Sequence, residues 1–178
     1  GAYAELIKQG KVRAIGTSNM TPERLKASLA ASKANGLPRY DSLQPLYNLS
    51  DRNEFESEYL PICRAENIGV INYYSLAAGF LTGKYASVED AAKNPARGPR
   101  LKRYLDARGQ RILNAIRDTA ARHNAKPAQV ALAWLMARPA MTAPIVSATS
   151  LTQLNELMAA PQLALNAGDI KMLDAASG

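Results

Sequence analysis

The feature that most constrains the fold of this chain is a strand-like run followed by a helix-like run, repeated four times. The four runs are short and occupy Val12–Thr17, Tyr40–Tyr47, Ile68–Tyr74 and Ala143–Ser147, and all but the second are rich in β-branched residues. Strands that alternate with helices in this way are joined by crossover connections and lie parallel in one sheet. With 178 residues, the chain has room for a single domain of this α/β class.

Polar residues mark where the intervening helices begin. Thr21 followed by Pro22 is a typical start, because threonine caps the first free N–H groups and proline fits the first helical turn. Capping boxes are predicted at two further starts, which are Asp51 with Glu54 and Ser150 with Gln153. The helix that follows Lys126 is apolar nearly all round, which predicts that it is deeply buried.

The composition excludes several kinds of site. One cysteine, Cys63, rules out a disulfide framework and a cysteine-based zinc site, and one histidine, His123, rules out motifs that need two. His123 lies where a helix is expected to end, so we predict a structural or solvent-facing role for it. No apolar run approaches the ~18 residues of a membrane span, and residues 1–10 lack the pattern of a secretory signal. We therefore expect a reduced, cytoplasmic protein that does not bind a membrane.

A net charge of +7 favours an anionic partner, such as nucleic acid or a phosphorylated small molecule. Basic residues concentrate in a long break between predicted elements, residues 75–108, and such breaks are usually functional or disordered. The basic cluster comprises Arg97, Arg100, Lys102, Arg103, Arg108 and Arg111. It is either a solvated surface or an electrostatic aid to a bound dinucleotide. Nucleic acid is disfavoured, because Tyr104 is the sole aromatic residue interleaved with the cluster.

Five segments, taken in order, resemble the second half of the aldo-keto reductases. They are Gly10–Asn19, Gln44–Asn48, Tyr74–Tyr85, Pro127–Trp134, and Pro144–Ser150 with Gln153-Leu154. The resemblance covers essentially the whole chain. It implies that residues 1–178 form one domain, half of a (β/α)8 TIM barrel, with four parallel strand–helix units and a C-terminal helix. Residues 75–108 would be a loop that embraces the cofactor, and residues 2–9 the end of the preceding helix.

Aldo-keto reductases are oxidoreductases that reduce aldehydes and ketones by hydride transfer from NADPH, while a tyrosine assisted by a lysine gives the proton. The resemblance places the catalytic Asp, Tyr, Lys and His on strands that precede the fifth. We therefore expect this chain to lack them and to be inactive alone. It implies NADP(H) as cofactor, with NAD(H) left open, and a small carbonyl substrate that binds when the N-terminal half is supplied.

At the nicotinamide end, the resemblance implies that Ser18, Asn19 and Gln44 contact the carboxamide and that Tyr74 stacks on the ring. The alternatives are a plain strand-to-helix turn for the first two, an outward-facing strand residue for Gln44 and a rim aromatic for Tyr74. At the pyrophosphate, it implies the segment 75–84, where glycines would let backbone N–H groups approach a phosphate closely.

At the adenosine 2′-phosphate, the resemblance implies the eighth-strand segment. Ser147 and Ser150 stand where family members frequently have glycine and a basic residue, so we expect a weaker preference for NADPH over NADH. No catalytic or metal-ligating residue is assigned. The cofactor-binding residues implied are Ser18, Asn19, Gln44, Tyr74, Ser75, Leu76, Gly79, Leu81, Gly83, Lys84, Ser147, Thr149, Ser150 and Gln153.

Two functions of different class fit these observations. The chain is either the cofactor-binding half of a reductase, as a truncated gene or fragment, or a cofactor-binding or assembly module without chemistry. In both cases four parallel strands leave two bare edges, Val12–Thr17 and Ala143–Ser147. Because bare strand edges pair readily with other chains, self-association is expected.

Overall fold

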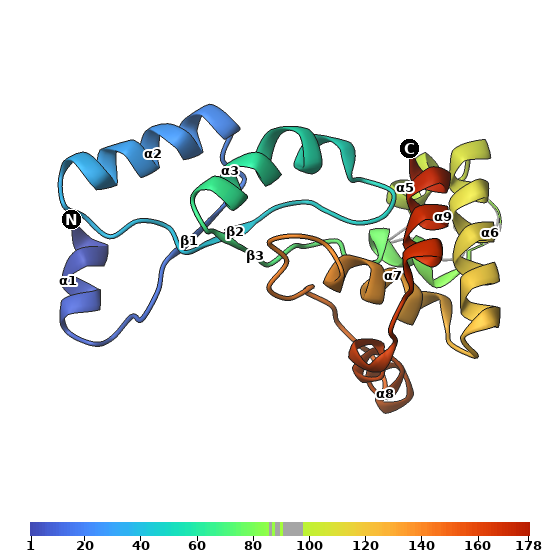
Figure 1. Ribbon diagram of the computed structural model, residues 1–178. Helices are drawn as coiled ribbons and strands as arrows, with labels where there is room; N and C mark the ends of the chain where they lie inside the picture. The colour runs from blue at the N-terminus through green and yellow to red at the C-terminus, as the bar shows by residue number, and fades with distance from the viewer. Residues whose placement is uncertain (86, 88–89, 91–97) are drawn as a thin grey trace.

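Three short parallel strands form the sheet of the computed structural model, which describes residues 1–85, 87, 90 and 98–178. The strands are β1 (Gly16–Ser18), β2 (Ser42–Gln44) and β3 (Gly69–Val70), in the order β1-β2-β3 (Figure 1). Both neighbouring pairs are parallel. The α/β class and the parallel arrangement predicted from the sequence are therefore confirmed.

The first strand begins later than the predicted run Val12–Thr17. The Val12 N–H donates to the Leu6 carbonyl (3.3 Å), and this bond belongs to the end of helix α1 (Ala2–Lys8). A residue that still closes a helix is not free to join a ladder, so β1 starts at Gly16.

The fourth predicted strand, Ala143–Ser147, is not a strand. Residues 140–145 run beside β3, and the Ile145 N–H donates to the Asn72 carbonyl across 3.0 Å. The pairing is irregular because Pro144 has no N–H to donate. The described part of the chain therefore has three strands in its sheet, and the predicted four-strand half-barrel is not confirmed.

Two longer helical segments lie on one side of the strands (Figure 1). They are α2 (Pro22–Ala34) and the π-helix η1 (Phe55–Tyr59), which continues into α3 (Leu60–Ala65). The predicted cap of α2 is confirmed, because the Thr21 hydroxyl accepts from the Arg24 N–H (3.3 Å). The predicted capping box at Asp51 is wrong: its carboxylate accepts instead from the Tyr104 hydroxyl (2.6 Å).

The C-terminal part of the chain is helical, including much of the region predicted as a loop over residues 75–108. Its elements are η2 (Ala77–Thr82), α5 (Gly98–Leu101), η3 (Lys102–Tyr104), α6 (Ala107–Arg122), α7 (Pro127–Met136), α8 (Leu151–Met158), η4 (Ala160–Gln162) and α9 (Ala167–Ser177). The middle of that region, residues 91–97, lies outside the described residues.

Helices α6, α7 and α9 pack together around a core in which α7 is buried as predicted. Trp134 of α7 is fully buried, and its indole N–H donates to the Asp174 carboxylate of α9 (2.9 Å). The guanidinium groups of Arg52 and Arg138 lie over the same indole ring, at 5.1 and 4.8 Å. Among the described helices, none is long and apolar enough to cross a membrane.

Candidate functional site

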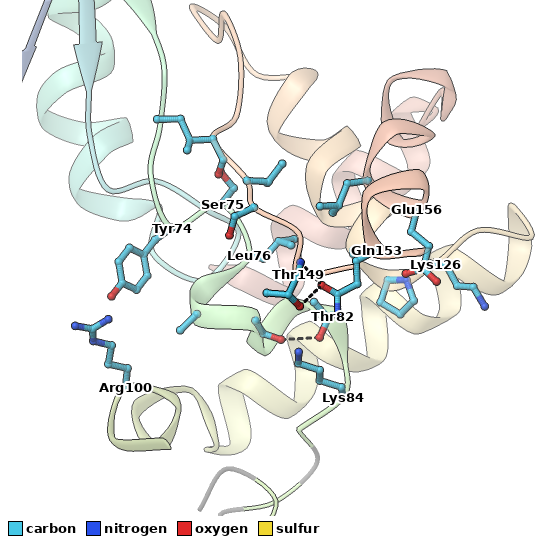
Figure 2. A pocket seen from close by; sticks show the side chains of 18 residues that line it. Tyr74, Ser75, Leu76, Thr82, Lys84, Arg100, Lys126, Thr149, Gln153 and Glu156 are labelled. Atoms are coloured by element: carbon cyan, nitrogen blue, oxygen red, sulfur yellow. Dashed lines mark hydrogen bonds between the residues drawn. The ribbon is translucent and has the colours of Figure 1, made fainter. Parts of the chain in front are cut away.

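A cavity of about 570 Å³ lies beside the chain where it leaves β3, between that segment and the first turns of α7 and α8 (Figure 2). This volume is typical of small-molecule and cofactor sites. Eight predicted cofactor-binding residues line it, namely Tyr74, Ser75, Leu76, Gly79, Lys84, Ser147, Thr149 and Gln153. The other six are not among its lining residues: Ser18, Asn19, Gln44, Leu81, Gly83 and Ser150.

A sharp left-handed turn shapes one wall of the cavity. Backbone φ angles are positive at Tyr74, Ala77, Ala78 and Gly79. Glycine adopts such angles at little cost, whereas each other residue costs about 1–3 kcal/mol, so the surrounding packing must hold the turn. The Gly79 N–H donates to the Leu76 carbonyl (2.8 Å), and the Thr82 hydroxyl donates to the Gly79 carbonyl (2.7 Å). In this structure the Gly79 N–H therefore closes the turn instead of facing the cavity.

Ser75 lies in the wall, but its hydroxyl is already in use. The side chain is buried, donates to the Ile145 carbonyl (2.7 Å) and accepts from the Asn72 side-chain amide (3.0 Å). These bonds fasten residues 140–145 to the segment after β3. Ser75 therefore builds the cavity, and in this arrangement its O–H is not available to donate to a ligand.

Tyr74 presents its ring at one end of the cavity (Figure 2). The Arg100 guanidinium lies over that ring at 5.9 Å, and the ring of Tyr73 meets it edge-on with centroids 5.8 Å apart. The Tyr74 carbonyl accepts from the buried Asn48 side chain (3.0 Å). The backbone of Tyr74 is thus fixed, whereas its ring is bounded by one exposed cation and one aromatic edge.

At the other end, Thr149 fixes the orientation of the Gln153 amide. Both the N–H and the hydroxyl of Thr149 donate to the Gln153 side-chain oxygen, at 3.0 and 3.1 Å. The amide NH2 is thereby turned away from Thr149 as a donor. Ser150 accepts from the Gln153 backbone N–H (3.2 Å) and so caps α8, which confirms half of the predicted capping box.

Cations outnumber anions along the cavity. Lys84, Arg100 and Lys126 line it with exposed side chains, and Glu156 is the one carboxylate among the described lining residues. In Figure 2, Arg100 lies at the Tyr74 end, Lys126 lies at the α7–α8 end and Lys84 lies between them. The arrangement favours an elongated ligand with more than one anionic group.

The three residues predicted to contact a carboxamide lie at the ends of β1 and β2, apart from this cavity. The Ser18 hydroxyl donates to the Gln44 carbonyl (2.8 Å), and the Asn19 side-chain oxygen accepts from the Tyr73 hydroxyl (3.2 Å). These bonds leave the Asn19 and Gln44 side-chain NH2 groups as the donors at this end. Their contact with a ligand stays a prediction.

Two further predicted residues act in packing. Leu81 is fully buried in the core behind the turn. Gly83 has a φ of 74° and ends η2, and its carbonyl accepts from Arg117 of α6 (3.3 Å). Both residues support the segment that carries Lys84 and do not line the cavity themselves.

The basic cluster divides by what its members contact. Arg103 pairs with Asp51 (2.6 Å) and lies over the ring of Tyr104, while Arg108 donates to the carbonyls of Ser50 and Ser177. Burial, together with the Asp51 carboxylate, raises the pKa of Tyr104 above its usual range. Of the described members, Arg100 lines the cavity, and Arg97 lies outside the described residues.

Several lining residues were not predicted as part of the site. Lys126 and Pro127 carried a helix-start signal, and Ile145 and Val146 carried a strand signal. Neither signal says that a side chain faces a cavity, because that depends on how α7 packs against α8. His123 is not among the lining residues and pairs with the buried Asp169 (2.7 Å), which fits the structural role predicted for it. Among the described residues no group of three potential metal ligands comes together.

A parallel sheet with a cation-lined cavity beside the chain that leaves a strand is typical of α/β proteins that bind anionic ligands at strand ends. This chain belongs to the aldo/keto reductase family, whose model matches residues 1–177. The family is one of oxidoreductases.

Named relatives agree with that assignment. The chain is 33% identical over 154 residues to Protein tas of Escherichia coli K12, covering 86% of this chain and 44% of that protein. It is 34% identical over 162 residues to an aldo-keto reductase of Babesia bovis, covering 87% and 56%. The chain thus spans about half the length of the curated relatives it matches.

A solved structure shares the fold. It is the crystal structure of a thermostable aldo-keto reductase, Tm1743, in complex with the inhibitor epalrestat. The TM-score is 0.72 at 24% sequence identity, and the match covers 98% of this chain and 52% of that one.

Proposed function

We propose that this chain binds NADP(H) as the cofactor-binding half of an aldo-keto reductase. The observation that carries the proposal is the cavity of about 570 Å³, lined by eight of the residues that the family resemblance implied, Lys84 among them, and by two further cations, Arg100 and Lys126. A dinucleotide phosphate is elongated, carries several negative charges and has an aromatic ring at each end. The three cations are spaced along the cavity and suit the negative charges. The Tyr74 ring lies at one end and suits an aromatic ring, and the polar start of α8 lies at the other end.

In this proposal each wall of the cavity has its own task. Tyr74 offers a ring face to the nicotinamide, and Lys84, beside the left-handed turn, offers a positive charge to the pyrophosphate. Gln153, oriented by Thr149, donates to the adenosine end. When bound, NADPH supplies the hydride that reduces a carbonyl carbon.

The proton must come from another group, and Tyr47 is a poor source of it. Tyr47 is fully buried and donates to Glu56 (2.7 Å), and burial and that carboxylate raise its pKa above the usual range. We propose that the catalytic Asp, Tyr, Lys and His belong to the other half of a (β/α)8 barrel and that a carbonyl substrate binds once that half is present.

The experiment is a calorimetric titration of the full 178-residue chain with NADP+ and with NAD+. We expect saturable binding with one site for each chain, and loss of binding in Ser147→Trp, which fills the cavity. Thr152→Trp places the same side chain on an exposed position of α8 outside the cavity lining and is the matched control. No binding of either dinucleotide, or equal binding by the two variants, would contradict the proposal.

A further inference from the structure

Lys126 stands at a fixed position beside α8, although its ammonium group is exposed. It is the residue before α7, and its backbone N–H donates to the side chain of Gln129 (2.8 Å). The same side chain donates from its NH2 to the backbone carbonyl of Glu156 in α8 (2.9 Å). One glutamine therefore ties the start of α7 to α8 and sets where Lys126 can reach.

The charge balance at the α7–α8 end of the cavity depends on Lys126. Lys84 and Arg100 come from other elements, and in Figure 2 Arg100 lies at the Tyr74 end and Lys84 lies between the two ends. Glu156 also lines the cavity, so without Lys126 an anionic ligand would meet an uncompensated carboxylate there. Ser150 cannot compensate, because it is not among the lining residues and its hydroxyl accepts from the Gln153 N–H.

We propose that Lys126 is the residue that selects a dinucleotide with an additional phosphate at its adenosine end. The inference rests on the proposed function and adds to it the group that distinguishes NADP(H) from NAD(H). A lysine ammonium recognises phosphate as a point charge, and the NH2 group of Gln153 supplies a neutral donor at the same end. The additional phosphate, bound at the α7–α8 end, then interacts with the Lys126 ammonium. The dinucleotide that lacks this phosphate does not make that interaction.

Ionic strength should affect the affinity for NADP(H) more than the affinity for NAD(H). Lys126 is exposed, so its attraction for phosphate is screened by salt. The preference for the phosphorylated dinucleotide should therefore shrink as salt rises from about 10 mM to about 500 mM, where the Debye length falls from about 30 Å to a few ångströms. A preference set by shape alone would not change in this way.

The test titrates the full chain and its Lys126→Gln variant with NADP+ and NAD+, and with the smaller pair adenosine 2′,5′-bisphosphate and AMP. We expect Lys126→Gln to weaken NADP+ and the bisphosphate about five- to ten-fold, while NAD+ and AMP change less than about two-fold. Lys126→Arg should keep the preference. Lys171→Gln, which removes an exposed lysine from α9, is the control for net charge and should leave all four affinities unchanged.

The outcomes separate this inference from the function on which it rests. Equal weakening of phosphorylated and unphosphorylated ligands, or no change in either, would overturn the role of Lys126 and leave the proposed function standing. If the wild-type chain binds none of the four ligands, both fall together. Near-UV circular dichroism of each variant shows whether the fold is intact, and Lys126→Arg provides the comparison if Lys126→Gln is misfolded.

Discussion

Asp169 is a buried carboxylate, 3% exposed, at the start of α9. Burial by itself would raise its pKa, but hydrogen bonds from Arg122 (2.8 Å) and His123 (2.7 Å) prevail and lower the pKa to about 2. A carboxylate with a lowered pKa stabilises the folded state above the pKa it has when unfolded, about 4. This contribution is lost as the pH falls from about 4 through about 2.

We predict that Asp169→Asn lowers the free energy of unfolding by about 2 kcal/mol at pH 7, the size of a hydrogen bond to a charged group. The deficit should shrink as the pH approaches 2, because the wild-type carboxyl is then protonated as well. Urea unfolding of both proteins between pH 2 and pH 7, at low protein concentration, measures it. Asp118→Asn, at an exposed position of α6, should show no such trend. A deficit that does not vary with pH would contradict the assignment.

At the scale of single residues, the sequence predicted site residues that lie in a local motif. It did not predict residues whose place depends on partners far along the chain. Tyr74 and Gly79 carry a family motif and both line the cavity, and their contact with a cofactor stays a prediction. Ser75 was predicted among the cofactor-binding residues, and its hydroxyl donates to the Ile145 carbonyl, seventy positions along the chain. No local pattern contains a bond of that kind, and the same holds for Lys126, whose place is set by contact between two helices.

Helix α6 begins against the segment that precedes it, and Gly109 makes that approach feasible. Asp106 caps the helix by accepting from the Gly109 N–H (2.7 Å). A Cβ added at Gly109 would lie 1.7 Å from the Tyr104 carbonyl oxygen, so a larger residue must displace backbone. The Tyr104 ring also stacks on Phe80 of η2, with centroids 5.2 Å apart, so the displacement would reach the cavity wall.

We predict that Gly109→Ala destabilises the chain by about 1–3 kcal/mol, although alanine is the better helix former. Gln110→Ala changes the next, exposed residue and should alter stability by less than about 0.5 kcal/mol. The measurement is the midpoint of thermal unfolding for the two variants and the wild type. If the two variants have the same midpoint, the close approach of Tyr104 to α6 is not a constraint on the fold.

At the scale of elements, helices were easier to predict than strands, because capping side chains close in sequence mark where a helix starts. Thr21 and Ser150 cap helices as their sequence context predicts. A strand exists only where a partner pairs with it, so β1 begins at Gly16 and the run after Ala143 forms no strand. The π-helical turn at Phe55–Tyr59 carried no signal that was read from the sequence.

For the whole molecule, the proposed half-barrel has a catalytic consequence. We predict that the chain alone shows no turnover of NADPH with a reactive aromatic aldehyde, because a general acid contributes about 10²–10⁴-fold in rate and none is assigned here. The absorbance of the nicotinamide, followed at a saturating concentration of the aldehyde, measures the turnover. Steady turnover that survives repurification would refute the prediction, and Tyr74, which lines the cavity, would then be the first residue to test as proton donor.

The surface of the molecule also predicts association between chains. Within the described sheet β1 pairs with β2 alone, so its other edge is open. Helix α8 has no fully buried side chain, and Leu151 and Met158 are 78% and 66% exposed. Open edges and exposed apolar side chains are both stabilised by contact with another chain, and closed barrels remove the first of them.

We therefore predict that the chain forms dimers or larger particles as its concentration rises. The double variant Leu151→Glu with Met158→Glu should weaken this association if α8 supplies the contact, since two charges would have to be buried with it. Leu37→Glu, at an exposed leucine after α2, is the matched control and should associate like the wild type. Light scattering after size exclusion, over a concentration series, measures the mass. If the double variant associates as strongly as the wild type, α8 does not supply the contact. A monodisperse wild-type monomer with sharp near-UV circular dichroism and no dye binding would exclude a contact through α8 and one through the edge of β1.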